Sequence, residues 1–281
     1  PGITKFVQLP PTPVLSRHHA EALIALGQKA DPESEVWTWW DWGYATHYYA
    51  QLHSFADGGR HYGEHVFTLG LALATPNPLQ SAQLIQYSAL QDNQPWKVWE
   101  EMGLERTRDF LRNLGAEAMG FEPDTPLYVV ATFENIRLAP WICYYGTWDF
   151  EKQQGVHARV AGIKESFNLN WDTGEMVFQD ESQAVPVESI HVLSTQGRKD
   201  RHYDANSGPH LIINSEDRRF YAVDELAFQS MLTQLVMAPQ GFERIDRHFE
   251  LVIDDFPWVR VYKVRRNQPP FLNGGGTAPP Q

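Results

Sequence analysis

The sequence is almost free of cysteine. Cys143 is the only cysteine in 281 residues, which excludes an intramolecular disulfide and a zinc site built from several thiolates. The compartment stays open, because a chain of this length can bury a core large enough to fold without disulfides. The same length suits one large domain or two ordinary ones.

The chain also lacks a basic excess and any long apolar run. Lys and Arg total 23 against 35 Asp and Glu, so the formal net charge is −12. This balance argues against binding to the phosphate backbone of nucleic acids. No apolar stretch reaches the roughly 18 residues of a transmembrane helix, and no signal peptide follows the abrupt start at Pro1. We therefore expect either a cytoplasmic protein or a piece of a larger one.

Several catalytic signatures are missing as well. The sequence contains no GxSxG, no CxxC and no glycine loop placed after a strand. His61 and His65 have the i, i+4 spacing of a metal pair on a helix, but Gly63 lies between them and there is no HExxH pattern. We therefore predict no metal site in this chain.

Helical patterns dominate the first half of the chain. Ser16 is a predicted cap for a helix through Leu26, and Asn77 followed by Pro78 is a predicted start for the next one. Apolar periodicity predicts further helices at about 95–102, 104–114 and 134–146, the last kinked or divided by Pro140. The β-branched stretch "TPLYVVATF" between them predicts a strand.

The second half alternates between apolar and polar residues in short segments, which is typical of strands. One helix capped by Asp224 and two closing strands follow it. We predict an α+β fold with a mainly helical core, into which a β-rich, barrel-like unit is inserted. The predicted boundaries are 1–150 for the core, 151–223 for the insert, 224–273 for the return to the core and 274–281 for a flexible tail.

What the sequence has in abundance is tryptophan at one place. The stretch "WTWWDWGY", residues 37–44, holds four of the ten tryptophans around Asp41. One interpretation is a strand buried on both faces, with Trp37 and Trp39 on one side and Trp40 and Trp42 on the other. Asp41 fits that interpretation badly, because a buried carboxylate needs partners.

A second interpretation uses the hydrogen-bonding groups directly. An indole offers only a hydrogen-bond donor, whereas a carboxylate offers only acceptors. Together they can bind one hydroxyl, which donates its proton to the carboxylate and accepts the indole N–H. Two further classes are open at this point. A carbohydrate-binding module would use exposed tryptophan faces for stacking, and a soluble glycosidase would need two carboxylates. The candidate carboxylates for a glycosidase are Asp41, Glu64, Glu134 and Asp149.

The residues Trp39-Trp40-Asp41-Trp42-Gly43 resemble the WWDYG signature of the oligosaccharyltransferase catalytic subunit. The similarity extends through "VWTWWDWGYATHYYAQLHSFADGGRHYG" and, in the same order, through "LYVVATFENI", "WDTGEMVF" and "DELAFQSMLTQLVM". The chain is therefore identified as resembling the C-terminal domain of a bacterial single-subunit member of that family. Trp42 departs from the usual Tyr and cannot accept a hydrogen bond.

The resemblance implies roles for individual residues. In this family the WWD residues bind the Ser/Thr hydroxyl of an Asn-X-Ser/Thr sequon, which assigns that role to Trp39, Trp40 and Asp41. A helical Met-x-x-Ile motif of the bacterial branch corresponds to Phe133 through Ile136, where Ile136 would contact a threonine methyl. The resemblance adds three possible supporting positions: Trp42, Gly43 and Phe133.

The resemblance also implies a setting. The whole enzyme would transfer a glycan from a lipid pyrophosphate carrier to asparagine at the periplasmic face of the bacterial inner membrane. Its Mn²⁺ or Mg²⁺ and its catalytic carboxylates belong to a transmembrane domain absent from this sequence. We therefore expect no cofactor and no catalytic residue in this chain, and no glycan transfer by the chain alone. Its expected partners are the acceptor protein or peptide, that transmembrane domain and the lipid-linked oligosaccharide.

Overall fold

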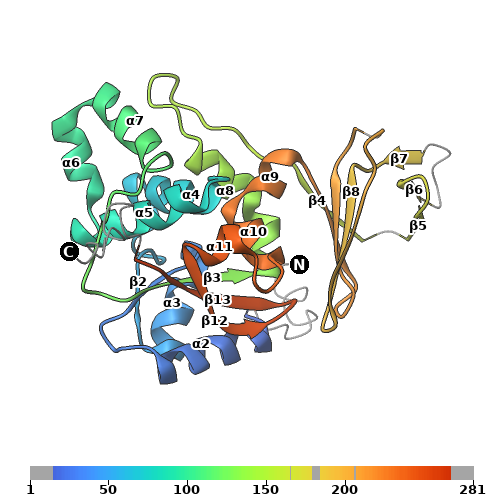
Figure 1. Cartoon of the computed structure of the whole chain (residues 1–281), viewed down its shortest axis with the longest axis horizontal. Helices are drawn as coiled ribbons and strands as arrows, with labels where there is room; N and C mark the ends of the chain where they lie inside the picture. Colours follow the sequence, from blue (N-terminus) through green and yellow to red (C-terminus); the bar gives the residue numbers. More distant parts are fainter. Residues whose placement is uncertain (1–14, 165, 179–183, 206, 267–281) are drawn as a thin grey trace, which may run out of the picture.

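The computed structural model describes residues 15–164, 166–178, 184–205 and 207–266. The Pro-rich entry 1–14 and the predicted tail 274–281 lie outside this part. A five-stranded mixed sheet, ordered β12-β13-β3-β1-β2, forms the centre of the larger body (Figure 1). β1, β2 and β3 are parallel, and β13 runs antiparallel to both β3 and β12. These strands are β1 (Glu35–Trp37), β2 (His53–Ser54), β3 (Leu127–Thr132), β12 (Phe249–Asp255) and β13 (Val259–Val264).

Strand β3 shows why the sheet is enclosed on both sides. All six of its residues are buried. Val129 and Ala131 pack into one hydrophobic cluster, while the intervening Tyr128 and Val130 pack into another. A strand that is buried on both faces has a nearly continuous apolar sequence, and "LYVVAT" is such a sequence.

Helices cover the two faces unequally. One face packs against α2 (Arg17–Lys29), which supplies Leu23 and Leu26 to the smaller cluster. The other face packs against a thick helical layer, so the mainly helical core has three layers with the sheet in the middle (Figure 1). The helices of this side are α4 (Glu64–Ala74), α5 (Pro78–Leu90), α6 (Pro95–Met102), α7 (Leu104–Asn113), α8 (Ala139–Gly146), α9 (Glu225–Gln229), α10 (Met231–Met237) and α11 (Glu243–Asp246).

The predicted helix caps are confirmed. Ser16 accepts a hydrogen bond from the His19 N–H at 3.2 Å, and Asn77 Oδ1 accepts from the N–H of Leu79 at 3.0 Å. Asp224 likewise accepts from Ala227 N–H at 3.0 Å. Each side chain satisfies backbone donors that the first helical turn leaves without a partner.

Of the local predictions, two are confirmed and one needs correction. Gly63 separates His61 from the helix that holds His65: with φ of +54° it precedes α4, which begins at Glu64. The predicted helix after Asp224 is broken at Ser230, whose hydroxyl caps a second helix by accepting from Thr233 N–H at 3.3 Å. The segment around Pro140 is divided as predicted, because a 3₁₀ helix η3 (Phe133–Leu138) leads into α8, which holds the proline in its first turn.

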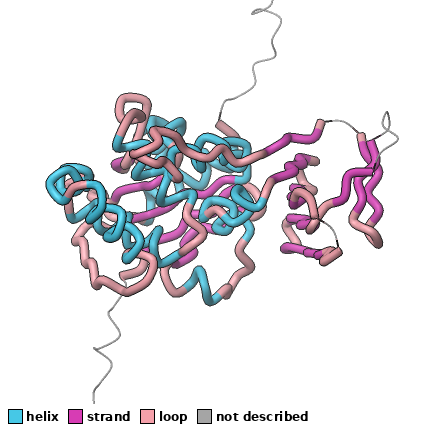
Figure 2. Tube along the Cα trace, turned by 90° about the horizontal axis from the view of Figure 1, so that it is seen from above, coloured by secondary structure: helices cyan, strands magenta, loops and turns pink. Residues whose placement is uncertain are grey.

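The second half forms a separate β unit at one end of the molecule (Figure 2). It consists of a five-stranded sheet, ordered β4-β11-β10-β8-β9, and a three-stranded sheet, ordered β5-β6-β7. In the described residues both sheets are open, so the α+β class is confirmed but the barrel-like description is wrong. The strands are β4 (Val160–Ile163), β5 (Phe167–Asn170), β6 (Glu175–Phe178), β7 (Ala184–Pro186), β8 (Ser189–Ser194), β9 (Gly197–His202), β10 (His210–Asn214) and β11 (Arg219–Val223).

None of the helices in the described residues combines the length and the apolar character that crossing a bilayer requires.

Candidate functional site

Three turns of the chain meet at one edge of the central sheet. The parallel strands β1, β2 and β3 all end there. After β1 comes the tryptophan cluster, after β2 the Asp57-Gly58-Gly59 turn and after β3 the helix η3. The carboxyl ends of parallel strands are the usual ligand-binding edge of an open sheet. The fold therefore brings the two predicted motifs, at Trp39–Trp42 and Phe133–Ile136, to the same edge.

The first tryptophan of the cluster belongs to the core. Trp37 is fully buried and stacks on Phe55 with ring centroids 3.8 Å apart. Its indole N–H donates to Glu35 Oε1 at 2.8 Å, and Asn93 also donates to this carboxyl group. Burial raises the pKa of Glu35 to about 7, although Trp37, Asn93 and the charge of Arg60 oppose the shift. Trp37 and Glu35 thus form a closed structural pair.

The interpretation of residues 37–42 as one continuous strand is wrong. β1 ends at Trp37, and the chain enters a 3₁₀ turn, η1, over Trp40–Trp42. This turn separates the tryptophans by environment. Trp39 and Trp42 are buried, Trp40 is half-buried and Asp41 is exposed. The turn therefore brings the carboxylate out of the core, which removes the objection that Asp41 would be buried without partners.

Trp42 connects the two motifs. Its indole N–H donates to Asn135 Oδ1 in η3 at 2.7 Å, inside the core. Its ring meets His19 edge-on, with centroids 5.3 Å apart. This contact explains why a tryptophan works at the departure from Tyr. The position needs a donor directed at Asn135, and an indole supplies one.

Gly43 is required by a close approach of the backbone. A Cβ at this position would lie 2.3 Å from the carbonyl oxygen of Ala56 and 2.5 Å from Asp57 Cβ. Any larger residue would push the first turn away from the second. After Gly43 the chain continues as α3 (Gly43–Ala45) and the π-helical turn η2 (Thr46–Ala50) before it reaches β2.

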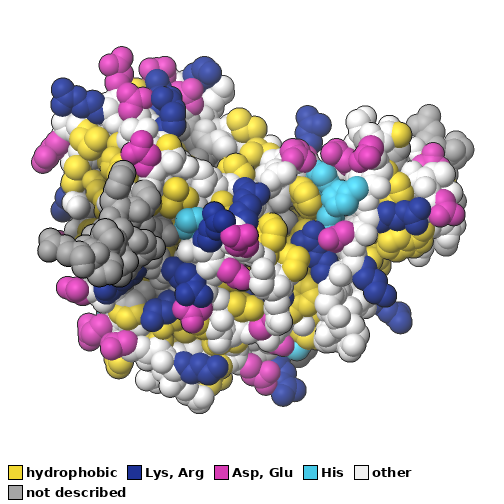
Figure 3. Space-filling view, viewed as in Figure 1, with side chains coloured by type: hydrophobic (Ala, Val, Ile, Leu, Met, Phe, Trp, Pro, Cys, Tyr) yellow, Lys and Arg dark blue, Asp and Glu magenta, His cyan; other side chains and the backbone are white. Residues whose placement is uncertain are grey.

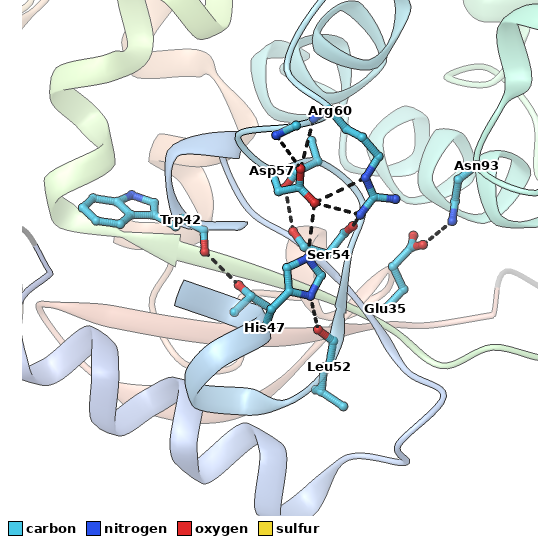
Figure 4. Close-up of polar contacts among 11 residues, drawn as sticks. Glu35, Trp42, His47, Leu52, Ser54, Asp57, Arg60 and Asn93 are labelled. Carbon is cyan, nitrogen blue, oxygen red and sulfur yellow. Dashed lines mark hydrogen bonds and ion pairs between the residues drawn. The ribbon is translucent and has the colours of Figure 1, made fainter. Parts of the chain in front are cut away.

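The second turn is held together by Asp57 (Figure 4). Its carboxylate accepts from Gly59 N–H at 2.8 Å and from Arg60 N–H at 3.0 Å. The Arg60 guanidinium lies 3.0 Å away and His47 Nε2 lies 3.3 Å away. Partial burial alone would raise the pKa of Asp57, but these donors outweigh it and lower the pKa to about 2. Asp57 is therefore ionised and fully engaged within the protein.

Asp41 is the opposite case. No described residue donates a hydrogen bond to its carboxylate or forms an ion pair with it. Partial desolvation raises its pKa, while the charges of Arg137 and His61 oppose the shift. The carboxylate is thus exposed, close to Arg137 and free to accept a hydrogen bond from a ligand.

The two indoles that precede Asp41 are also open donors. In the described part of the chain, no partner accepts a hydrogen bond from the N–H of Trp39 or Trp40. Trp39 is only 2% exposed and lies against Tyr145, with centroids 6.5 Å apart. Trp40 stacks on His61 at 4.5 Å. The rings are held by packing, which leaves the N–H groups unused.

The residues predicted from the third turn lie deeper. Ile136 has no exposed surface, and Phe133 is 1% exposed and packs on Tyr221 at 5.2 Å. A contact between Ile136 and a ligand therefore stays a prediction, and in this arrangement it would require η3 to move. Thr132 fixes the start of η3 by accepting from Asn135 N–H at 3.2 Å.

Two hollows lie beside this edge. A groove of about 880 Å³ between η3 and the β unit is lined by Glu134, Arg137, Lys164, Arg219 and Tyr221, among others. A second, apolar cavity of about 630 Å³ lies among the helices and includes Tyr145, which touches Trp39. Charged side chains cover much of the face shown in Figure 3.

Sequence reasoning missed Asn135, which lies inside the quoted "LYVVATFENI" segment, and Arg137, which directly follows it. Asn135 binds Trp42, and Arg137 is an exposed cation whose charge acts on Asp41. The only available signal was their position next to Ile136. His61 and His65, the predicted non-ligands, serve as ring contacts: His61 stacks on Trp40, and His65 lies 4.4 Å from Trp96.

Comparison with known proteins is informative once this geometry is known. Residues 32–152 match the STT3/PglB/AglB core domain. The chain is 39% identical over 61 residues to the undecaprenyl-diphosphooligosaccharide–protein glycotransferase of Campylobacter jejuni strain RM1221, and 38% identical over 61 residues to that of C. jejuni serotype O:2. Each match covers 22% of this chain and 9% of the relative.

The fold is also similar to a solved structure, the C-terminal domain of C. jejuni PglB. The TM-score is 0.64 at 18% sequence identity, and the alignment covers 88% of this chain and 99% of the other. At this identity the likeness shows a common fold. The curated relatives are much longer than the segment they share with this chain.

Proposed function

We propose that this chain, whose residues 32–152 match the STT3/PglB/AglB core domain, recognises the acceptor sequon Asn-X-Ser/Thr for an oligosaccharyltransferase. The complete enzyme would transfer a glycan from a lipid pyrophosphate carrier to the sequon asparagine at the periplasmic face of the inner membrane. Its manganese or magnesium would be held by the transmembrane part. The role of this chain is to hold the acceptor.

The open carboxylate of Asp41 is the observation that carries the proposal. Asp57 at this edge and Glu35 at the start of β1 are occupied by internal donors, whereas Asp41 is not. A sequon hydroxyl can donate its proton to Asp41 and accept an indole N–H from Trp39 or Trp40 on its lone pair. Those two N–H groups are open in the described structure.

Such a site distinguishes a hydroxyl from a methyl group. A ligand without the hydroxyl would leave a carboxylate and an indole donor unpaired on binding, which costs more than a missing apolar contact. The family's use of Ser and Thr, but no apolar isostere, follows from this asymmetry. Ordering the hydroxyl end of the sequon also orders the asparagine for attack elsewhere in the enzyme.

The experiment measures this coupling in the full-length enzyme that carries the chain. Peptides with Asn-X-Thr and Asn-X-Val differ by one hydroxyl for one methyl, so their binding ratio reports the hydroxyl contact. We expect wild type to prefer Thr strongly, and Asp41→Ala to reduce the Thr/Val ratio roughly ten- to a hundred-fold. Asp109→Ala, an exposed carboxylate on α7, is the matched control and should leave the ratio unchanged.

An Asp41→Ala enzyme that still separates the Thr and Val peptides as well as wild type would remove Asp41 from the recognition of the hydroxyl. For the isolated chain, we expect no transfer from a lipid-linked donor with either metal. Metal-dependent glycan transfer by the isolated chain would contradict the proposal that this chain holds the acceptor while catalysis takes place elsewhere in the enzyme.

The two rival functions gain less support. A sugar-stacking platform needs flat exposed indole faces, but three of the four motif tryptophans are at most 4% exposed. A glycosidase needs two available carboxylates. Glu134 is ion-paired with Arg219 at 2.7 Å, and Asp149 accepts from the N–H groups of Glu151 and Lys152. Neither carboxylate is as open as Asp41, which leaves the exposed Glu64 at the start of α4 as the remaining candidate for a second carboxylate.

A further inference from the structure

A second polar cluster lies where the β unit meets the helices. Glu188 precedes β8, His210 begins β10 and Glu225 begins α9. Their ligand atoms, one from each residue, all lie within 4.8 Å of one another. His210 is 3% exposed, whereas both glutamates are exposed.

His210 is part of a continuous hydrogen-bonded chain. Glu225 Oε2 lies 2.7 Å from His210 Nε2, and His210 Nδ1 lies 2.7 Å from Ser189 Oγ. Ser189 Oγ lies 2.7 Å from His191 Nε2, and His191 Nδ1 lies 2.7 Å from Asp200 Oδ1. Ser189 and His191 are fully buried, so water cannot supply a missing partner at the centre.

Counting hydrogens shows that this chain lacks one. It has four contacts, each of which needs one hydrogen between its two heavy atoms. A neutral imidazole carries one N–H and a serine one O–H, so the two histidines and Ser189 supply three, and ionised carboxylates supply none. Suppose that His210 Nδ1–H donates to Ser189, Ser189 O–H donates to His191 Nε2, and His191 Nδ1–H donates to Asp200. Three of the four contacts are then hydrogen bonds. The fourth, between His210 Nε2 and Glu225, then places a lone pair against a carboxylate oxygen.

We propose that a divalent transition-metal ion, of the zinc type, occupies this position, bound by His210 Nε2, Glu225 and Glu188. A cation between His210 and Glu225 removes the repulsion of lone pairs and completes the chain with both histidines neutral. Neutral imidazole nitrogen and carboxylate oxygen are ordinary zinc ligands, and three protein ligands leave a fourth position for water. A single proton would also fill the His210–Glu225 gap, and the titration with zinc distinguishes these two occupants.

The spacing of the cluster suits such an ion. Ligand atoms about 2.1 Å from a tetrahedral zinc lie roughly 3.4 Å from one another. The 2.7 Å contact of His210 with Glu225 and the 4.8 Å limit of the cluster bracket that value. Because both glutamate side chains are exposed, small rotations can bring their oxygens to bonding distance.

The surroundings hold the buried ligand in place. Phe228 of α9 stacks on the His210 ring at 3.9 Å and on His191 at 4.9 Å. Asp200, the far end of the chain, also accepts from Arg198 Nε at 2.6 Å, and His202 lies edge-on to His191 at 5.5 Å. A ligand histidine whose other nitrogen donates to a fixed acceptor has its orientation and tautomer set. Because its ligands lie at the starts of these three elements, the ion would link strands β8 and β10 to helix α9.

The test titrates tag-free, metal-stripped protein with zinc chloride in a calorimeter. We expect one ion per chain for wild type. Glu225→Gln and Glu188→Gln change exposed residues, so folding should be retained, and each should weaken binding at least ten-fold. Glu105→Gln makes the same charge change at an exposed site on α7 and should bind like wild type. Ser189→Ala breaks the support of His210 and should weaken binding roughly 10- to 100-fold.

A second readout separates this site from zinc held by the other histidines. Cobalt bound to the wild-type site should give the visible absorption of a tetrahedral nitrogen–oxygen complex, and Glu225→Gln should abolish it. Zinc binding that is equal in wild type and both glutamine variants would overturn the proposal. So would the absence of saturable binding, since a proton would then occupy the position between His210 and Glu225.

Discussion

Two aspartates at the same edge of the sheet have opposite environments. Asp57 begins the turn after β2, with a side chain that is 10% exposed and surrounded by donors from Gly59, Arg60 and His47. Asp41 lies in the turn after β1, is exposed and has no described donor. The pKa of Asp57 is lowered to about 2, whereas partial desolvation raises that of Asp41.

The difference separates a structural carboxylate from one available to a ligand. The acceptors of Asp57 are used by its own loop, so it contributes to stability and offers little to a ligand. Asp41 contributes little to stability and keeps its acceptors for another molecule. Residue type and position in a motif do not make this distinction, because both aspartates fall within the segment that resembles the family signature.

The largest expected effect is on stability at Asp57. Asp57→Ala removes the acceptor for two backbone N–H groups and leaves the Arg60 charge without its partner, so the free energy of unfolding should fall by about 3 kcal/mol. Because the folded pKa of Asp57 is lowered, its contribution is present above the unfolded value and is lost as pH falls toward about 2. Urea denaturation of the chain measures the loss, and Asp41→Ala is the control that should change stability little.

Glu35 extends the comparison to a carboxylate that is closed and buried. Its folded pKa is raised to about 7, so its contribution to stability is present below the unfolded value near 4.5 and is lost as pH rises through 7. The shift corresponds to about 3 kcal/mol. Glu35→Gln mimics the protonated acid and should equal wild type at pH 4.5 but exceed it by about that amount at pH 8. Parallel stability curves for the two proteins would show that Glu35 is not protonated in the folded state.

Replacing Asp41 should lower activity strongly and stability little, the reverse of replacing Asp57. In the full-length enzyme, Asp41→Ala should lower the rate of glycosylation of an Asn-X-Thr peptide about ten- to a hundred-fold, the equivalent of one charge-assisted hydrogen bond. The melting temperature of the chain should stay within a degree or two of wild type, since no internal contact is lost. A large fall in melting temperature would place Asp41 with Asp57 among the structural carboxylates.

Trp42 tests the connection between the two motifs. Trp42→Phe keeps the ring but removes the N–H, which leaves Asn135 Oδ1 without its donor in the core. We expect a loss of about 1.5 kcal/mol in the free energy of unfolding. In the double variant Trp42→Phe, Asn135→Ala the second change should cost less than it does alone, and additive losses would show that the bond contributes nothing.

The smallest expected effect is at Ile136. Ile136→Val removes one methylene from a fully buried side chain and should cost about 1 kcal/mol of stability. If η3 opens to let this residue touch the acceptor, the preference for Thr over Ser sequons should also fall. Rates on matched Thr and Ser peptides measure this preference. An unchanged ratio would leave Ile136 as a core residue only.

The sequence alone determined those features that depend on neighbouring residues. The caps at Ser16, Asn77 and Asp224 satisfy backbone donors two or three positions ahead, so they were readable without a fold. Hydrophobic patterning likewise gave the α+β class, and the tryptophan motif gave the family. The sequence did not decide whether Asp41 is buried or exposed, because a tryptophan-rich segment is compatible with either environment.

Only the tertiary structure decided which distant groups meet. The parallel pairing of β1, β2 and β3 brings the turns at Asp41, Asp57 and Ile136 to one edge, and no local pattern encodes that pairing. The bond between Trp42 and Asn135 and the chain through His210, Ser189 and His191 likewise join residues from different elements. Hydrogen-bond partners are set by distances in the folded core, so a carboxylate is shown to be closed or open only after the chain has packed.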